Sequence, residues 1–172
     1  VWFQPEQGRA GELTSFNTKT GAMTYYGWPY SYGLGNLDSI MGYDPLQDKL
    51  ILTSFRGGGV IAERDLSNPS TAWKVIAQKN TPSMHGQHAF AWSNLRQAWI
   101  VWDSYSGNSV YELKRGVNAS GTPEYAWTLL TSPYNTIQAV GGSTNGSYKK
   151  FQIVQTAPGI EVLVGQLRVA DG

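Results

Sequence analysis

The 172-residue sequence contains no cysteine. It therefore has no disulfide scaffold, no thiol nucleophile and no structural zinc site built on thiolates. Charged residues make up only 15% of the chain, against the usual figure of about 25%, and the formal net charge is +1. This balance excludes a disordered polar chain and a protein that binds nucleic acid or anionic membranes through its charge.

Long apolar runs and helical patterns are also missing. No run of about 18 apolar residues occurs, so the sequence predicts no membrane insertion through a helix. Glycine or proline interrupts most windows, and no long stretch keeps the apolar spacing of an amphipathic helix. The first residues, Val1-Trp2-Phe3, resemble the middle of a strand, and we expect both ends to be cuts in a longer or processed chain.

The chain does contain many short runs rich in β-branched and aromatic residues, separated by turn residues. Runs of this kind are typical of an all-β barrel, sandwich or propeller. The strands predicted from these runs are 11–17, 22–28, 39–43, 49–55, 60–66, 73–78, 89–93, 98–104, 109–114, 125–130, 137–140, 150–156 and 160–166.

An internal repeat distinguishes among these architectures. Residues 49–55 align with 98–104, and residues 60–66 align with 109–115, both at an offset of 49. Residues 150–156 align with 49–55 at an offset of 101. A repeat of about 50 residues with four strands has the size of a propeller blade. A β-sandwich with accidental self-similarity is the alternative.

The second strand of each repeat is a continuous apolar run. Leu50-Ile51-Leu52 and Trp99-Ile100-Val101-Trp102 contain no alternating polar residue. A strand exposed on one face would alternate, so these runs predict strands that are buried on both faces.

These residues resemble a kelch-repeat propeller of the galactose-oxidase-like type. The resemblance rests on Tyr43-Asp44-Pro45, on Gly57-Gly58-Gly59-Val60, on Trp73 and Trp127, and on a final unit, 146–156, similar to the last blade of such propellers. It implies four-stranded antiparallel blades over 1–172, a single propeller segment with units at about 1–30 (partial), 37–80, 87–133 and 137–172 (partial). Further blades of a longer chain or a second copy in a homodimer would complete the ring. Alternatively, the chain would form a small ring that lacks one strand.

The repeat register also predicts a ligand-binding face. In a propeller the loops that enter the inner strands meet at one mouth of the central channel, where ligand sites combine apolar walls with a few polar groups. The alternative is that polar residues in these loops only solvate the rim. The polar candidates are Asn36, Asp38, His85, His88, Asn135 and Gln138, and the flanking aromatic candidates are Tyr30, Tyr32 and Tyr134.

The sequence contains few groups of residues that have the pattern of a catalytic or metal site. His85 and His88, the only histidines, are candidate metal ligands, but the sequence offers no third ligand nearby. The galactose-oxidase family uses copper and a tyrosine–cysteine cross-link, which a chain without cysteine cannot form. Glu63 and Asp65 lie on the same side of a strand, and we expect an exposed polar face there rather than a glycosidase pair. The sequence predicts no catalytic residue and no cofactor.

We therefore expect a non-enzymatic binding module, extracellular or secreted, that recognises a glycan or protein through its loop face. The alternatives are a fragment of a secreted oxidase- or hydrolase-like enzyme and a structural subunit that uses unpaired blade edges. Asn118-Ala119-Ser120 and Asn145-Gly146-Ser147 match the N-glycosylation acceptor pattern, whereas Asn68-Pro69-Ser70 is excluded by its proline.

Overall fold

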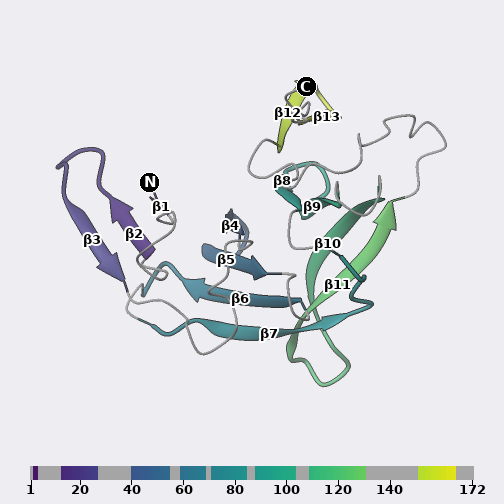
Figure 1. The fold of residues 1–172 in the computed structure, drawn as a ribbon, viewed down its shortest axis with the longest axis horizontal. Coiled ribbons are helices and arrows are strands. Elements are labelled where there is room, and N and C mark those ends of the chain that lie inside the picture. The colour runs from purple at the N-terminus through teal and green to yellow at the C-terminus, as the bar shows by residue number, and fades with distance from the viewer. Residues whose placement is uncertain are drawn as a thin grey trace, which may run out of the picture. The chain divides into compact units, whose positions relative to one another are not determined.

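A computed structural model describes residues 2–3, 13–26, 40–54, 59–68, 71–84, 88–103, 109–130 and 151–165. Every regular element in these ranges is a β-strand, which confirms the predicted all-β class (Figure 1). No helix long and apolar enough to cross a membrane occurs in the part of the chain that is described. The chain divides into two compact units, Val1–Val75 and Ile76–Gly172, which are treated separately below.

The first unit contains two antiparallel sheets. Its strands follow one another along the chain, and each strand of a sheet pairs with the next. The first sheet consists of β1 (Trp2–Phe3), β2 (Leu13–Phe16) and β3 (Met23–Tyr26), and the second begins with β4 (Ile40–Asp44), β5 (Lys49–Ser54) and β6 (Val60–Asp65).

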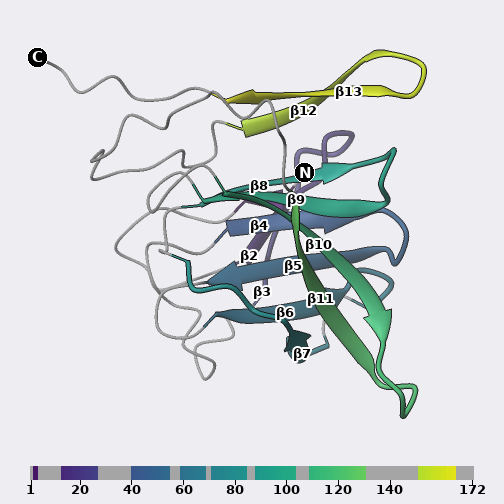
Figure 2. The ribbon, with the colours of Figure 1, turned by 90° about the vertical axis from the view of Figure 1, so that its right-hand side faces the viewer.

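The second unit contains a four-stranded antiparallel meander and a separate hairpin (Figure 2). The division between the units falls inside β7 (Lys74–Lys79), whose residues 77–79 pair in parallel with the outer strand of the meander. The meander strands are β8 (Ala89–Ser93), β9 (Ala98–Asp103), β10 (Ser109–Val117) and β11 (Pro123–Leu130), and the hairpin strands are β12 (Phe151–Ala157) and β13 (Ile160–Gly165).

The predicted strands match β2 to β13, with bounds that differ by a few residues. The strand predicted at 137–140 lies outside the described residues, and β1 falls within Val1-Trp2-Phe3, the residues that resemble the middle of a strand. The largest difference is in β10, which runs past the predicted end at Lys114 because Gly116 pairs with Glu124 and Val117 pairs with Pro123. Glycine and proline in a sequence indicate a turn. Here, however, Pro123 is the first residue of β11, a position where the missing N–H of proline is tolerated.

The sequence repeat is also a repeat of strand pairing. The strands β4, β5 and β6 begin 49 residues before β8, β9 and β10. The pair Ser54↔Val60 becomes Asp103↔Ser109 at the same offset. The hairpin β12–β13 follows the offset of 101, since Phe151↔Gly165 corresponds to Leu50↔Arg64.

The turn that follows the first strand of each repeat has the same backbone geometry. Asp48 and Gln97, which are 49 residues apart, have φ values of 51° and 50°. Non-glycine residues seldom adopt this left-handed conformation, which glycine reaches without steric cost. The coincidence at two equivalent positions shows that the turn type is part of the repeated unit.

The second strand of each repeat is buried on both faces. Every residue of β9 is buried, and so are the four consecutive residues from Leu50 to Thr53 in β5. Successive side chains of a strand point to opposite faces, so each strand is covered by a layer on either side. This confirms the prediction from the two continuous apolar runs.

Each unit has its own apolar cluster. In the first unit Trp73 packs with Leu50, Leu52 and Ala62. In the second unit Ala89, Ile100 and Trp102 form a cluster on one face of the meander, and Ile153 of β12 packs against it.

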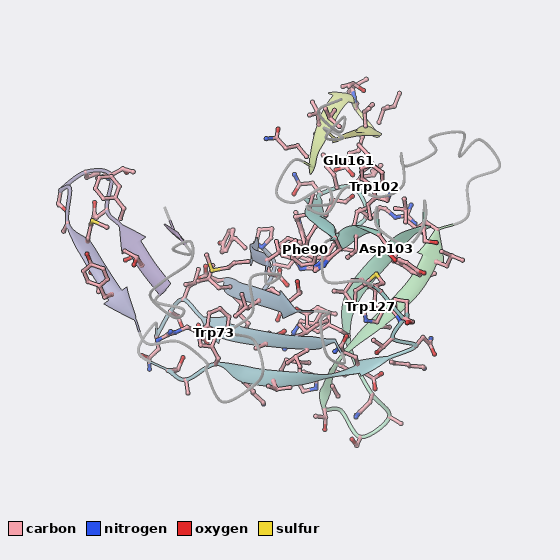
Figure 3. All side chains as sticks on the ribbon, viewed as in Figure 1. Trp73, Phe90, Trp102, Asp103, Trp127 and Glu161 are labelled. Carbon is pink, nitrogen blue, oxygen red and sulfur yellow. The ribbon has the colours of Figure 1, made fainter. Side chains whose placement is uncertain are left out.

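The other face of the meander bears several aromatic side chains, of which Figure 3 labels Phe90 and Trp127. The rings of Phe90 and Trp99 stack with centroids 4.1 Å apart, and Trp92 meets Trp99 edge-on at 5.2 Å. Trp127 is 3% exposed and its Nε1 donates a hydrogen bond to Gln78 Oε1 at 2.9 Å, which ties β11 to β7. Aromatic pairs in these geometries add about 0.5–1.5 kcal/mol to the burial of their area.

The expected exposed polar face at Glu63 is wrong. Glu63 is 4% exposed, and its Oε2 lies 3.3 Å from Lys49 Nζ. Its neighbour Arg64 is also buried, with the guanidinium carbon 5.9 Å from the centre of the Trp73 ring. The alternating charges indicated a solvated strand, but both faces of β6 are covered, and each buried charge has a partner that offsets part of its desolvation.

Leu113 and Leu129 lie on the same face of adjacent strands, but Leu113 is 0% exposed and Leu129 is 50% exposed. Substituting each of them tests how far the stability of the fold depends on burial. We expect Leu113→Ala to lower the free energy of unfolding by about 2–5 kcal/mol, because it removes buried methyl groups and leaves a cavity. Leu129→Ala is the matched control and should change it by about 0.5 kcal/mol or less. Urea unfolding followed by tryptophan fluorescence measures both, and equal losses would contradict the assigned burial.

Candidate functional site

Two buried ionisable residues lie at one end of the four-stranded meander. His88, which immediately precedes β8, is 0% exposed, and Asp103, the last residue of β9, is 3% exposed. Continuing the β8–β9 register by one residue beyond Ala89↔Trp102 puts His88 opposite Asp103, and Ser109 of β10 pairs with Asp103 from the other side. We call this end of the meander the His88 end.

Burial makes the two polar groups depend on their partners. A charged or polar side chain that leaves water without forming a hydrogen bond loses about 1–3 kcal/mol or more. Both His88 and Asp103 have interaction partners in the structure, so neither is an uncompensated buried group. An imidazole can donate and accept hydrogen bonds and a carboxylate accepts several, so both side chains are suited to a hydrogen-bonded site at this end of the meander.

Aromatic residues flank the same end. Phe90 follows His88 by two residues on β8 and so lies on the same face as His88, whereas Trp102, next to Asp103 on β9, lies on the opposite face. Figure 3 shows Trp102, Asp103 and Phe90 in the same part of the second unit. Polar groups beside aromatic side chains have the composition of small-molecule and sugar sites. Sequence reasoning missed Asp103, although the antiparallel register of two predicted strands would have placed it opposite His88.

Most of the predicted ligand-binding residues lie outside the described ranges. His88 is the one ligand-binding candidate within the described residues, and Asn118 is the one described glycosylation candidate. The candidates outside the described residues are Tyr30, Tyr32, Asn36, Asp38, His85, Tyr134, Asn135, Gln138 and Asn145.

The metal-binding prediction for His85 and His88 stays a prediction, because His85 is outside the described residues. Among the residues that are described, no group of three or more histidine, cysteine, aspartate or glutamate side chains is arranged to hold a metal ion.

The opposite end of the meander contains a shared carboxylate. In the first unit, Asp44 caps the β4–β5 turn by accepting hydrogen bonds from the backbone nitrogens of Leu46 at 2.9 Å and Gln47 at 3.1 Å. The equivalent residue in the second unit is Ser93, whose Oγ accepts from the Arg96 nitrogen at 3.0 Å and donates to the carboxylate of Glu161. The β8–β9 turn therefore takes its carboxylate from β13.

Glu161 attaches the β12–β13 hairpin to this turn. Its Oε1 accepts a hydrogen bond from the Leu95 nitrogen at 3.0 Å, and Ile153 on the same face of the hairpin packs against the apolar cluster of β8 and β9. Arg96 adds a positive charge and itself pairs with Glu112, with Arg96 Nε 2.6 Å from Glu112 Oε2. The hairpin is thus held by apolar packing and by a charged hydrogen-bond network.

The same network shifts the pKa of Glu161. Partial burial raises the pKa, but the hydrogen bonds from Ser93, Leu95 and Asn94 and the charge of Arg96 outweigh it, so that the pKa lies below its usual value. The ionised carboxylate therefore stabilises the folded state at neutral pH.

Glu161→Gln should remove this stabilisation in a pH-dependent way. A lowered folded-state pKa gives stability that is present above the unfolded pKa and is lost as the pH falls through the folded value. We expect the wild type to unfold at a higher temperature than Glu161→Gln at neutral pH, and the difference to shrink below about pH 4. Thermal unfolding of both proteins across this range measures the difference, and a difference independent of pH would contradict the assignment.

The comparisons with known proteins add no relative. No protein-family model matches the sequence, and neither a curated protein nor a solved structure is similar to this chain. The functional argument therefore depends on the chain's own residues.

Proposed function

We propose that the protein is a non-enzymatic binding module, extracellular or secreted, built from kelch-like propeller blades. It recognises a glycan or protein partner through the loops at the His88 end of the meander. The observation behind the proposal is the buried His88 and Asp103, two polar residues kept at the end of the sheet where the connections 80–88 and 104–108 meet it.

Three features support propeller blades as the building unit. The strands β8 to β11 form a four-stranded antiparallel meander, and the pairing of β4 to β6 repeats that of β8 to β10 at an offset of 49 residues. The second strand of each repeat is buried on both faces, as neighbouring blades would require.

The two ends of the second unit differ in their connections. Turns at 94–97 and 118–122 link the strands at the end that contains Glu161, whereas 80–88, 104–108 and 131–150 connect the strands at the His88 end, and 80–88 and 131–150 are longer than either turn. Binding residues are commonly found on loops that a rigid scaffold positions. The predicted residues His85, Tyr134, Asn135 and Gln138 belong to these connections, which supports the His88 end as the ligand face.

The predicted residues of the first unit belong to the equivalent connection. Tyr30, Tyr32, Asn36 and Asp38 lie between β3 and β4, and β4 is the counterpart of β8 at the offset of 49. The repeat therefore supports the same kind of connection in both units, one that carries polar and aromatic residues and leads into the first strand of the repeat.

Binding to an oligosaccharide array tests the proposal, with His88→Gln and Asp103→Asn as the site variants. We expect the wild type to bind a subset of oligosaccharides, and each variant to bind roughly tenfold more weakly, since a buried polar partner that loses its hydrogen bond costs about 1–3 kcal/mol. Both substitutions nearly preserve side-chain volume, and thermal unfolding verifies that the variants are folded.

Leu95→Ser is the matched control for binding. Leu95 is 57% exposed in the β8–β9 turn, at the opposite end of the same strands, and its backbone nitrogen still binds Glu161 after the substitution. It should bind as the wild type does. A wild type that binds no oligosaccharide rejects the glycan ligand, and folded site variants that bind normally reject the His88 end as the site.

A second candidate function, a structural subunit of an assembly, is favoured by an exposed apolar row on β12–β13. Val154 pairs with Val162, and Val164 lies beside them on the same face, where the three are 42–51% exposed. The opposite face bears Ile153 and Glu161, which attach to β8 and β9. A second copy of the chain could cover the valine row.

Light scattering after size exclusion tests this second candidate. We expect a dimer whose mass falls to that of the monomer in Val162→Lys, because a charge in an apolar interface loses its hydration without gaining a partner. Val117→Lys is the control, since Val117 is 66% exposed at the end of β10. A wild type that is monomeric at all concentrations contradicts the assembly.

A further inference from the structure

The tip of the β10–β11 hairpin extends past the neighbouring strand of its sheet. On one side β10 pairs with β9 only as far as Leu113, while its pairing with β11 continues to Val117↔Pro123 (Figure 2). Residues 119–122 of the tip are exposed, and Val117 beside them is 66% exposed. A large group attached to the tip would therefore meet solvent on the β9 side.

Asn118 organises this tip through its side-chain oxygen. The Oδ1 atom accepts hydrogen bonds from the nitrogens of Ser120 and Thr122, each at 3.0 Å, and from the Ser120 hydroxyl at 2.7 Å. A backbone bond from Gly121 to the Asn118 carbonyl at 2.9 Å closes the turn, and Gly121 has a φ of 78° that favours glycine.

The amide nitrogen of Asn118 is left available by this arrangement. All hydrogen bonds of the side chain to described residues are made by Oδ1, so Nδ2 has no acceptor among them. Because Oδ1 is fixed on the inside of the turn, the planar carboxamide directs Nδ2 away from the turn's backbone donors.

We propose that Asn118 is an N-glycosylation site. An oligosaccharyltransferase and a lipid-pyrophosphate-linked oligosaccharide supply the reaction, which recognises the triplet Asn118-Ala119-Ser120. Nδ2 attacks the anomeric carbon, the new C–N bond forms as the anomeric C–O bond to the phosphate breaks, and the lipid pyrophosphate leaves. One Nδ2 proton passes to a base of the transferase. Oδ1 keeps its turn hydrogen bonds in the product.

The site is independent of the proposed ligand face. Since Ser109 at the start of β10 pairs with Asp103, the tip at the other end of β10 lies at the end of the meander opposite His88. A glycan on Asn118 therefore leaves the His88 end open, and the failure of one proposal does not affect the other.

Ala119→Pro is the matched variant, because proline in the middle of the triplet blocks the transfer. Ala119 is the second residue of the turn closed by the Gly121 to Asn118 bond, a position that favours proline, and its φ is not positive. The variant should therefore keep the turn and the wild-type unfolding temperature while it loses the glycan.

The test expresses the 172-residue chain behind a secretory leader in yeast, with Asn145→Gln in every variant to remove the second triplet. Mass spectrometry of peptides from secreted and cell-associated protein, with and without peptide N-glycosidase, locates the glycan. We expect a glycan on Asn118 and its complete loss in Ala119→Pro.

Pro69→Ala serves as the positive control for the host. It converts Asn68-Pro69-Ser70 into the same Asn-Ala-Ser triplet at Asn68, which is exposed, whereas Asn118 is half-buried. A chain in which Asn68 of this variant is glycosylated and Asn118 is not would overturn the proposal, and so would a glycan on Asn118 that persists in Ala119→Pro.

Discussion

The burial of one strand on both of its faces is the constraint on which the rest of this structure depends. In β5 and β9 the side chains of consecutive residues enter opposite covered layers, so a charged side chain there loses its hydration and needs a partner. Leu50, Ile51 and Leu52 are apolar in the first unit, and in the second every residue of β9 is apolar except Asp103, which has an interaction partner. Each such strand needs a hydrogen-bonded neighbour on both sides and an apolar layer on both faces, which explains why the flanking strands and turns recur with it.

The same constraint separates the two ends of the second unit. With β9 held in the centre, the meander register fixes His88 opposite Asp103 at one end and Ser93 beside Arg96 at the other. The second end is closed by short turns and by Glu161, which supplies from β13 the carboxylate that Asp44 supplies locally in the first unit. The first end keeps the buried polar residues His88 and Asp103 beside the connections 80–88 and 104–108, and for this reason we propose it as the ligand face.

The sequence predicts the strands well because their period and turn residues are local signals. The offset of 49 also predicts the register, since a shift of one residue would turn Ile100 and Trp102 away from their apolar cluster. The parallel pairing of β7 with β11 and the bond from Glu161 to Ser93 join residues far apart in the chain, and no local pattern reports them. Glu63 was misjudged because its charge indicated solvent, whereas the covered faces of β6 and the partner Lys49 decided its position.

Hydrogen exchange of backbone amides tests the central claim most directly, because exchange requires the opening of the bonds that hold a strand between its neighbours. The account predicts that the amides of β5 and β9 exchange most slowly and that those of β12 and β13, which form a two-stranded sheet, exchange much faster. Exchange in β9 as fast as in β13 would contradict a fold organised around a doubly buried strand.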